Sequence, residues 1–278
     1  MEGMIFSVVR NSFVDGPGIR TTVFFKGCNL RCRWCHNPES QSPVPQMLYN
    51  RRRCTGCGEC RAVCPNSMEK CTLCGACAAV CPNGARRICG QKISGDELLK
   101  QVIKDRVFYE TSGGGVTASG GECMLQIDFL AEFLQKCRKA GISTAVDTAG
   151  NVPWFYFERI LPVTDLFLYD IKAFTENLHR EGTMAPNRLI LDNLRRLSDD
   201  CDKEVRIRIP VIGGYNDSEE ELMRIRSFLE TTRFRTVDLL CYNDMSGGKY
   251  EETGITYTAF KKPTPEEMAS YRELFCFS

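Results

Sequence analysis

Long apolar runs and an excess of charge are both missing from this sequence. No apolar run approaches the roughly 20 residues that span a bilayer, and residues 1–10 lack the apolar stretch of a secretory signal. Thirty-six Lys and Arg face 35 Asp and Glu, a formal net charge of +1, so no overall field draws the chain to nucleic acid or anionic membranes. We therefore expect a cytoplasmic monomer that binds neither.

Cysteine, in contrast, is abundant, with 17 residues in a chain of 278. An odd number without a secretion signal argues against a disulfide framework and favours metal or cluster ligation. From about residue 49 to 88 no sustained helix or strand period is visible, as expected where metal ligation substitutes for a core. We predict a small inserted domain over residues 49–90. Six cysteines stand singly and are expected to be small buried apolar groups: Cys89, Cys123, Cys137, Cys201, Cys241 and Cys276.

Outside that stretch, apolar segments of strand length alternate with helical patterns, which indicates βα units and a parallel sheet. Ser94 and Ser218, each followed three residues later by Glu, predict capping boxes at two helix starts. Pro153 predicts a third start. We expect an α/β fold, a partial (β/α)6 TIM-like barrel, with residues 1–48 forming its first strand and cysteine loop and residues 91–278 the remainder. The expected strands are Ile19–Phe25, Gly115–Ser119, Ser143–Asp147, Asp165–Asp170, Glu204–Val211 and Thr236–Tyr242.

The ends of these strands carry polar residues. Parallel α/β barrels place their chemistry on the loops after the carboxyl ends of the strands, so these groups should share one rim. Taken alone, Gly-Gly-Glu also fits a turn with an incidental glutamate, and the Asp and Lys after the fourth strand also fit a buried ion pair. The residues expected at the rim are Gly120, Gly121, Glu122, Asp147, Thr148, Asp170 and Lys172.

The first cysteine motif is CxxxCxxC, formed by Cys28, Cys32 and Cys35. A structural zinc site requires four ligands, whereas three thiolates suit a [4Fe–4S] cluster whose fourth iron stays open to a small molecule. His36 could complete a zinc site, but it would have to wrap onto the same ion as its neighbour Cys35, which would be strained. The motif therefore favours an open cluster.

The second motif, C-x2-C-x2-C-x3-C-P, occurs twice, from Cys54 to Pro65 and from Cys71 to Pro82. It is the bacterial ferredoxin pattern, in which three cysteines hold one cluster and the fourth reaches the other. Two zinc ribbons are the alternative, but ribbons separate their CxxC pairs by a longer hairpin. The pattern predicts one cluster on Cys54, Cys57, Cys60 and Cys81 and another on Cys64, Cys71, Cys74 and Cys77.

Further segments complete a recognisable set: Val14–Arg20 (VDGPGIR), His36–Pro38 directly after the first motif, Ser119–Glu122, Asp147–Gly150 and Asp170–Lys172. Together with the cysteines they resemble, over nearly the whole chain, the glycyl-radical-enzyme activating enzymes of the radical S-adenosylmethionine superfamily. The inserted double ferredoxin motif is similar to that of the larger members.

The resemblance implies three [4Fe–4S] clusters and S-adenosylmethionine, and it allows a monovalent cation on Asp147 and Asp170. No side chain acts as acid or base; the radical chemistry occurs at the cluster of Cys28, Cys32 and Cys35. Reductive cleavage of S-adenosylmethionine gives a 5′-deoxyadenosyl radical, which abstracts hydrogen from a glycine of a partner glycyl radical enzyme. We predict that the other two clusters pass electrons inward from a flavodoxin or ferredoxin.

The resemblance also assigns roles to residues. Glu122 accepts a hydrogen bond from the amino group of the cofactor, while Gly120 and Gly121 allow close approach of backbone. Asp15, Gly16, Pro17 and Gly18 are best interpreted as part of the surface that receives the glycyl loop of the partner; a tight turn leading into the first strand is the competing interpretation. The other cofactor-lining residues are Asp147, Thr148, Lys172, Asn37, Asn243 and Trp34, the last of which could instead cover the cluster from water.

Three positions depart from the family pattern. Cys123 replaces a usual Pro, Gly213 follows Ile212 where relatives have Pro, and Asn243 replaces a usual His. Asn243 keeps hydrogen-bonding capacity but cannot titrate. Two rival functions also stay open: a radical enzyme acting on a small molecule or peptide, and an electron-transfer module, which would leave the first cysteine motif without a role.

Overall fold

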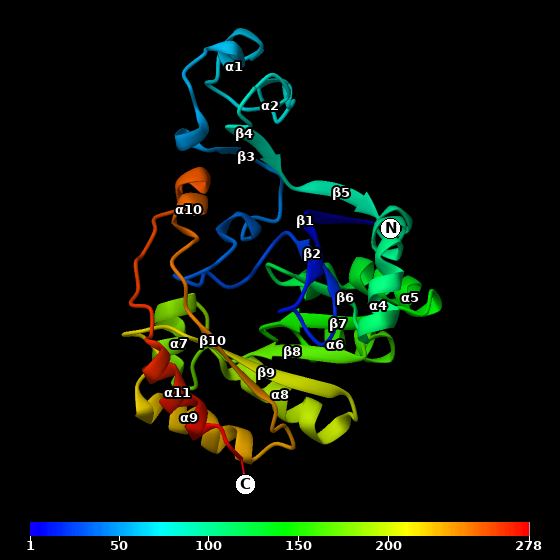
Figure 1. The fold of residues 1–278 in the computed structure, drawn as a ribbon, viewed down its shortest axis with the longest axis vertical. Coiled ribbons are helices and arrows are strands. Elements are labelled where there is room, and N and C mark those ends of the chain that lie inside the picture. Colours follow the sequence, from blue (N-terminus) through cyan, green and yellow to red (C-terminus); the bar gives the residue numbers. More distant parts are fainter. Residues whose placement is uncertain (278) are drawn as a thin grey trace.

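A computed structural model describes residues 1–277 (Figure 1). Its main sheet has eight strands in the order β10-β9-β8-β7-β6-β2-β1-β5. The six strands from β2 to β10 run parallel, which confirms the predicted βα repeats and agrees with a partial barrel. The strands are β1 (Glu2–Ser12), β2 (Arg20–Phe25), β5 (Gln91–Ser94), β6 (Gly115–Gly120), β7 (Ser143–Thr148), β8 (Leu166–Asp170), β9 (Glu204–Val211) and β10 (Val237–Cys241).

Two strands of the main sheet were not predicted. β1 pairs antiparallel with β2, and β5 pairs antiparallel with β1. β5 has four residues, of which only Ile93 is buried among its apolar side chains, so no alternation was long enough to read. Together these strands cover the edge of β2 that would otherwise be unpaired.

Helices follow the parallel strands and bury apolar faces against the sheet. On α5, Phe133 and Leu134 are fully buried in the same core as Phe167 of β8 and Ile207 of β9. The α-helices of this part are α3 (Gly95–Val102), α4 (Arg106–Ser112), α5 (Ile127–Lys139), α6 (Trp154–Ile160), α7 (Glu176–Thr183), α8 (Arg188–Asp200), α9 (Glu219–Glu230), α10 (Gly247–Thr253) and α11 (Pro265–Leu274). Short 3-10 helices are η1 (Pro38–Ser40), η2 (Arg51–Arg53), η3 (Ile103–Asp105), η4 (Cys123–Gln126) and η5 (Leu161–Val163).

The predicted helix starts hold with one correction. Ser94 and Glu97 form a complete capping box at α3, and Pro153 immediately precedes α6. Ser218 caps α9 by accepting from the Glu221 amide, but the expected return contact of Glu221 is wrong. The buried Glu221 carboxylate instead accepts hydrogen bonds from the loop between β8 and α7, whose free amides need an acceptor.

The single cysteines differ in exposure. Cys89, Cys123 and Cys137 are buried as expected, whereas the expectation is wrong for Cys201, Cys241 and Cys276. Cys241 ends the edge strand β10 and Cys276 follows the last helix, so neither has a second layer to cover it. Cys201 is half-buried at the end of α8.

The segment from β3 (Gln46–Tyr49) to β4 (Arg86–Cys89), called the insert from here on, projects from one end of the barrel (Figure 1). β3 and β4 pair antiparallel as a separate two-stranded sheet, and α1 (Glu59–Ala62) and α2 (Ala76–Ala79) are single turns. These elements have four residues each, too short to produce the sustained period that the sequence lacks there. No helix within residues 1–277 is long and apolar enough to cross a membrane.

Candidate functional site

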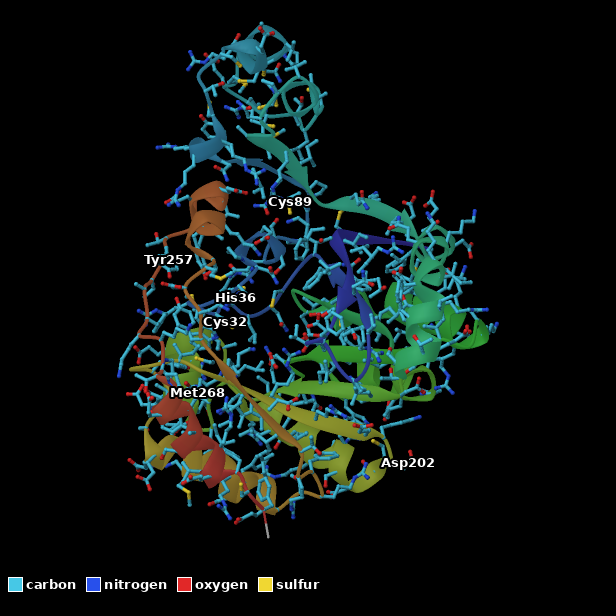
Figure 2. All side chains as sticks on the ribbon, in the orientation of Figure 1. Cys32, His36, Cys89, Asp202, Tyr257 and Met268 are labelled. Atoms are coloured by element: carbon cyan, nitrogen blue, oxygen red, sulfur yellow. The ribbon has the colours of Figure 1, made fainter. Side chains whose placement is uncertain are left out.

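The cysteine loop after β2 opens on a cavity of about 110 Å³ at the carboxyl ends of the parallel strands. Figure 2 shows Cys32 and His36 on this loop, between the insert and the sheet. The fold thus brings the predicted rim residues together around the first cysteine motif. The lining residues include Cys28, Cys32, Cys35, Gly120, Gly121, Glu122, Asp147, Thr148, Asp170 and Lys172.

Hydrogen bonds from two helices hold the backbone of the cysteine loop. The amides of Arg31 and Arg33 donate to the carbonyls of Thr183 and Gly182, at 2.8 and 3.0 Å. These carbonyls are among the unpaired acceptors at the end of α7. From the opposite side, the Tyr250 hydroxyl of α10 donates to the Arg33 carbonyl at 3.2 Å. The protein therefore fixes the loop by contacts that need no metal.

The three cysteines of this loop are half-buried. Burial raises the pKa of Cys28 and of Cys32 to about 12, because a thiolate is poorly solvated inside the protein. Such sulfurs become thiolates when a positively charged metal centre faces them. The donor set therefore fits a metal cluster rather than free reactive thiols.

Glu122 is a buried carboxylate facing the same cavity, 1% exposed. It accepts hydrogen bonds from the Thr148 hydroxyl at 2.8 Å, the Met124 amide at 3.2 Å and the Ala149 amide at 3.1 Å. Burial nevertheless raises its pKa to about 7. A cation bound in the cavity would favour the ionised form, so Glu122 fits an ammonium group.

The two glycines before Glu122 are required by the packing of the protein itself. Gly120 has φ +118°, and a Cβ there would lie 2.3 Å from the Phe25 amide nitrogen. A Cβ on Gly121 would lie 2.2 Å from the Gly27 carbonyl oxygen. These glycines let the end of β6 touch the loop after β2, which brings Glu122 next to the cysteines.

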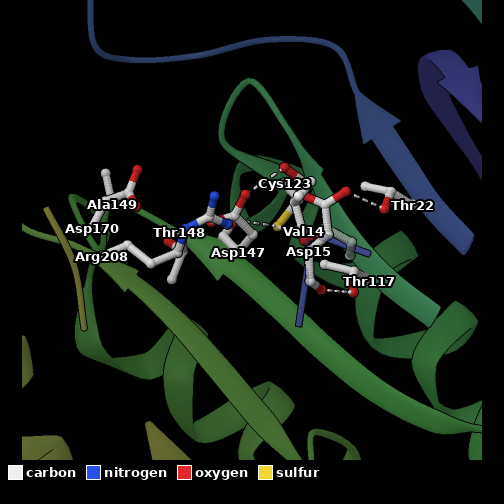
Figure 3. Close-up of polar contacts among 12 residues, drawn as sticks. Val14, Asp15, Thr22, Thr117, Cys123, Asp147, Thr148, Ala149, Asp170 and Arg208 are labelled. Carbon is white, nitrogen blue, oxygen red and sulfur yellow. Dashed lines mark hydrogen bonds and ion pairs between the residues drawn. The ribbon is translucent and has the colours of Figure 1, made fainter. Parts of the chain in front are cut away.

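Asp147 belongs to a polar cluster inside the barrel (Figure 3). Its carboxylate accepts from the Ser119 hydroxyl at 2.6 Å and pairs with Arg208 Nη1 at 3.4 Å. Burial raises the pKa of Asp147 to about 6, against the opposing charge of Arg208. Asp147 is therefore already partnered by protein groups.

Asp170 and Lys172 form the ion pair that the sequence allowed, with 2.8 Å between Oδ2 and Nζ. Burial alone would lower the pKa of Lys172, but the nearby acidic groups together, Asp170 foremost, keep the pKa above its usual value. The other oxygen of Asp170, Oδ1, is buried without a hydrogen-bond partner. Asp170, which lines the first cavity, thus keeps one carboxylate oxygen free to accept a hydrogen bond.

A second cavity of about 450 Å³ continues from the first and shares several of its lining residues. Trp34, Asn37 and Asn243 line it. Trp34 is 5% exposed and its ring lies 4.6 Å from that of Tyr215, so it also shields the loop from solvent. The three predicted residues therefore line the same cavity.

Lys249 of α10 fixes the orientation of Asn37. Its Nζ donates to Asn37 Oδ1 at 2.6 Å and to the His36 carbonyl at 2.9 Å, and it pairs with Glu39 Oε1 at 3.3 Å. Because the amide oxygen of Asn37 is occupied by Lys249, its NH2 is the group left to donate to a ligand. The sequence analysis did not find this contact, since no local pattern links α10 to the cysteine loop.

The segment Asp15–Gly18 folds into the barrel rather than away from it. Asp15 Oδ2 accepts from the hydroxyls of Ser12 at 2.6 Å and Thr22 at 2.7 Å, and its carbonyl accepts from Thr117 at 2.7 Å (Figure 3). Gly18 has φ +69°, and a Cβ there would lie 2.5 Å from a backbone nitrogen. The segment is a bend packed against β2 and β6, and Asp15 also lines the second cavity.

The insert gathers its eight motif cysteines around two further cavities. Equivalent amides in the two copies, Met68 and Ala85, donate to the sulfurs of Cys64 and Cys81 at 3.2 Å each. Such amide contacts favour thiolate sulfur and tune iron–sulfur centres. The cavity linings match the predicted grouping: Cys54, Cys57, Cys60 and Cys81 around one, and Cys64, Cys71, Cys74 and Cys77 around the other.

The three departures from the pattern have packing roles. Cys123 is fully buried, its sulfur 3.6 Å from the Asp147 carbonyl oxygen. A Cβ on Gly213 would lie 2.5 Å from the Lys261 carbonyl oxygen, so this close approach requires glycine. Asn243 accepts from the Met245 amide at 3.2 Å and keeps its place on the cavity wall.

Arg208 is the main site residue that the sequence analysis missed. It lies in β9 in register with Asp170, and its side chain is only 13% exposed. An arginine within a strand that otherwise alternates buried apolar residues was the available signal. Its position beside two carboxylates makes it part of the rim.

The fold and the cysteine-lined rim define a radical S-adenosylmethionine enzyme. Residues 22–225 match the family described as the Radical SAM superfamily, and this chain belongs to that superfamily. Within it the chain is one of the glycyl-radical-enzyme activating enzymes.

Individual proteins illustrate the likeness. The trans-4-hydroxy-L-proline dehydratase activating enzyme of Clostridioides difficile is 42% identical, over 99% of this chain and 96% of that protein. The choline trimethylamine-lyase activating enzyme of Oleidesulfovibrio alaskensis is 40% identical over 92% of this chain and 88% of that protein. A crystallised domain of a pyruvate-formate lyase-activating enzyme from Bacteroides vulgatus is 29% identical, with a TM-score of 0.50, over 58% of this chain and 92% of that one.

Proposed function

We propose that this protein activates a partner glycyl radical enzyme with an open [4Fe–4S] cluster held by Cys28, Cys32 and Cys35. One observation carries the proposal: these three cysteines and the buried carboxylate of Glu122 line one cavity at the carboxyl ends of the parallel strands. When bound, the cluster and S-adenosylmethionine supply a one-electron cleavage that yields a 5′-deoxyadenosyl radical. The activating enzymes among its relatives support a protein substrate.

The chain's own residues bind and orient the cofactor. Glu122 accepts a hydrogen bond from the methionyl ammonium. The Thr148 hydroxyl, which donates to Glu122, holds this carboxylate in place. Lys172 lines both the first and the second cavity, and Arg208 lines the second. Both add positive charge where the methionyl carboxylate is bound. The free Asp170 Oδ1 supports the further proposal that Asp170 and Asp147 share a monovalent cation beside the cofactor.

The second cavity receives the adenosine and the partner. Asn37 donates a hydrogen bond from its NH2 to the adenosine. Trp34 and Asn243 line the same cavity and contact the adenosine there. The same cavity extends to Asp15, where a glycine-containing loop of the partner would enter beside Asp15–Gly18. A glycine is the residue whose backbone can approach most closely.

We propose that the insert holds two auxiliary [4Fe–4S] clusters in a ferredoxin-like domain, predicted at residues 49–90; the pairing of β3 with β4 supports a separate unit there. The two cysteine-lined cavities and the amide contacts to sulfur support this arrangement. We propose that these clusters pass electrons from a flavodoxin or ferredoxin toward the open cluster.

The test is anaerobic reconstitution with iron and sulfide, then dithionite and S-adenosylmethionine, with and without a candidate glycyl radical enzyme. We expect 5′-deoxyadenosine, and an organic radical on the partner seen by electron spin resonance. Cys32→Ala serves as the matched control and should give neither. Cleavage of S-adenosylmethionine that consumes a small molecule or peptide, with no radical on any glycyl radical enzyme, would refute the proposal in favour of its enzymatic rival.

A further inference from the structure

Arg86 borders both cysteine-lined cavities of the insert. It is the first residue of β4 and pairs in register with Tyr49 of β3. Among the described residues, Arg86 alone belongs to the linings of both cavities. A single side chain thus lies between the two groups of four cysteines.

The guanidinium of Arg86 has few partners. Its Cζ lies 4.4 Å from the centre of the Tyr49 ring, while its Nε is buried without a hydrogen-bond partner. No carboxylate of residues 1–277 forms an ion pair with it. The half-buried Arg86 thus keeps a buried donor without an acceptor, which is costly, and its place is explained if anionic groups flank the guanidinium on both sides.

Arg86 faces cysteines of both groups. Cys77 lines one of the two cavities, Cys54 lines the other, and Arg86 lines both. One positive charge is therefore placed beside both sets of four cysteines.

We infer that Arg86 is a shared positioning residue that stabilises the reduced state of both auxiliary clusters. The inference rests on the proposed two-cluster insert. One electron entering either cluster from a flavodoxin or ferredoxin adds one negative charge, which Arg86 partly offsets; no bond forms or breaks at Arg86. Since net charge near a cluster sets its reduction potential, one arginine raises both potentials together.

The neighbouring Arg87 provides a matched control. It carries the same charge one residue further along β4 but pairs with Glu252 of α10 at 3.0 Å, and neither cavity includes it. Its replacement removes an arginine from the same strand without removing the charge between the cysteine groups.

The experiment is a redox titration of the anaerobically reconstituted protein, followed by electron spin resonance, for wild type, Arg86→Gln, Arg86→Lys and Arg87→Gln. We expect Arg86→Gln to disfavour reduction of both auxiliary clusters at least tenfold, about 59 mV for one electron. Arg87→Gln should leave both potentials at the wild-type values, and the open cluster should not shift in any variant. Unchanged potentials in Arg86→Gln, or a shift of one auxiliary cluster alone, would overturn the inference.

Loss of the clusters in Arg86→Gln does not remove the test. Arg86→Lys retains the charge, so it should bind as much iron as wild type and keep both potentials near the wild-type values. An Arg86→Lys protein that loses the clusters, or in which both potentials fall by about 59 mV or more, contradicts a charge-based role. Wild-type protein without auxiliary clusters would instead refute the two-cluster insert, a separate result.

Discussion

The cysteine loop of the barrel and the insert present their cysteines for cluster binding in different ways. The loop offers three half-buried cysteines whose backbone is fixed by α7 and α10. The insert offers four cysteines per cavity, several of them exposed, on single-turn helices and two short strands. A site that keeps one iron open must be shaped by the surrounding protein, whereas closed clusters can supply much of the stability of the small domain that holds them.

The largest expected effect is on the loop. Cys32→Ala removes one of only three ligands, so S-adenosylmethionine cleavage should fall by at least about 10³-fold, because an unligated cluster cannot deliver the electron. Both auxiliary clusters should remain. Iron analysis and 5′-deoxyadenosine yield measure the two effects; wild-type cleavage in this variant would contradict the assignment of the open cluster.

The comparison is sharpened by removing ligands from the insert instead. With both Cys57 and Cys74 replaced by Ala, we expect the insert to become sensitive to protease, because few side chains of the insert are buried. The barrel should stay intact. Cleavage driven by a flavodoxin or ferredoxin should fall strongly, and cleavage driven by dithionite should fall little. Undiminished turnover with the protein reductant refutes the relay.

A smaller effect is expected within the first cavity. Glu122→Gln keeps the shape of the side chain but loses its charge, so affinity for S-adenosylmethionine should fall about 10- to 100-fold, the size of a charge-assisted hydrogen bond of roughly 1.5–3 kcal/mol. Calorimetry under anaerobic conditions measures it. Glu132→Gln, the same substitution on α5 and outside the lining of this cavity, is the control and should bind normally.

The smallest effect concerns the contact of α10 with the loop. Lys249→Met frees Asn37 Oδ1 and removes the pairing with Glu39, which should weaken S-adenosylmethionine binding about 3- to 10-fold, the worth of roughly 1 kcal/mol of lost orientation. The spectrum of the cluster should not change. Equal affinity in Lys249→Met and wild type would show that Asn37 is oriented by other contacts.

The sequence predicted the parallel strands and the rim because both depend on local patterns: apolar strand segments, and polar residues directly after them. β5 escaped detection since four residues with one buried Ile93 make no pattern. Arg208 and Lys249 were missed for another reason, because their partners lie 61 residues away at Asp147 and 212 residues away at Asn37. Contacts over such separations are decided by the fold, which no local window contains.

The most direct test of the central claim is the electron spin resonance spectrum of the reduced protein with and without S-adenosylmethionine, recorded beside Cys32→Ala. An iron left open by three cysteines must respond to the cofactor, so we predict a changed spectrum in wild type and no change in the variant. Identical wild-type spectra with and without S-adenosylmethionine would contradict an open cluster at Cys28, Cys32 and Cys35.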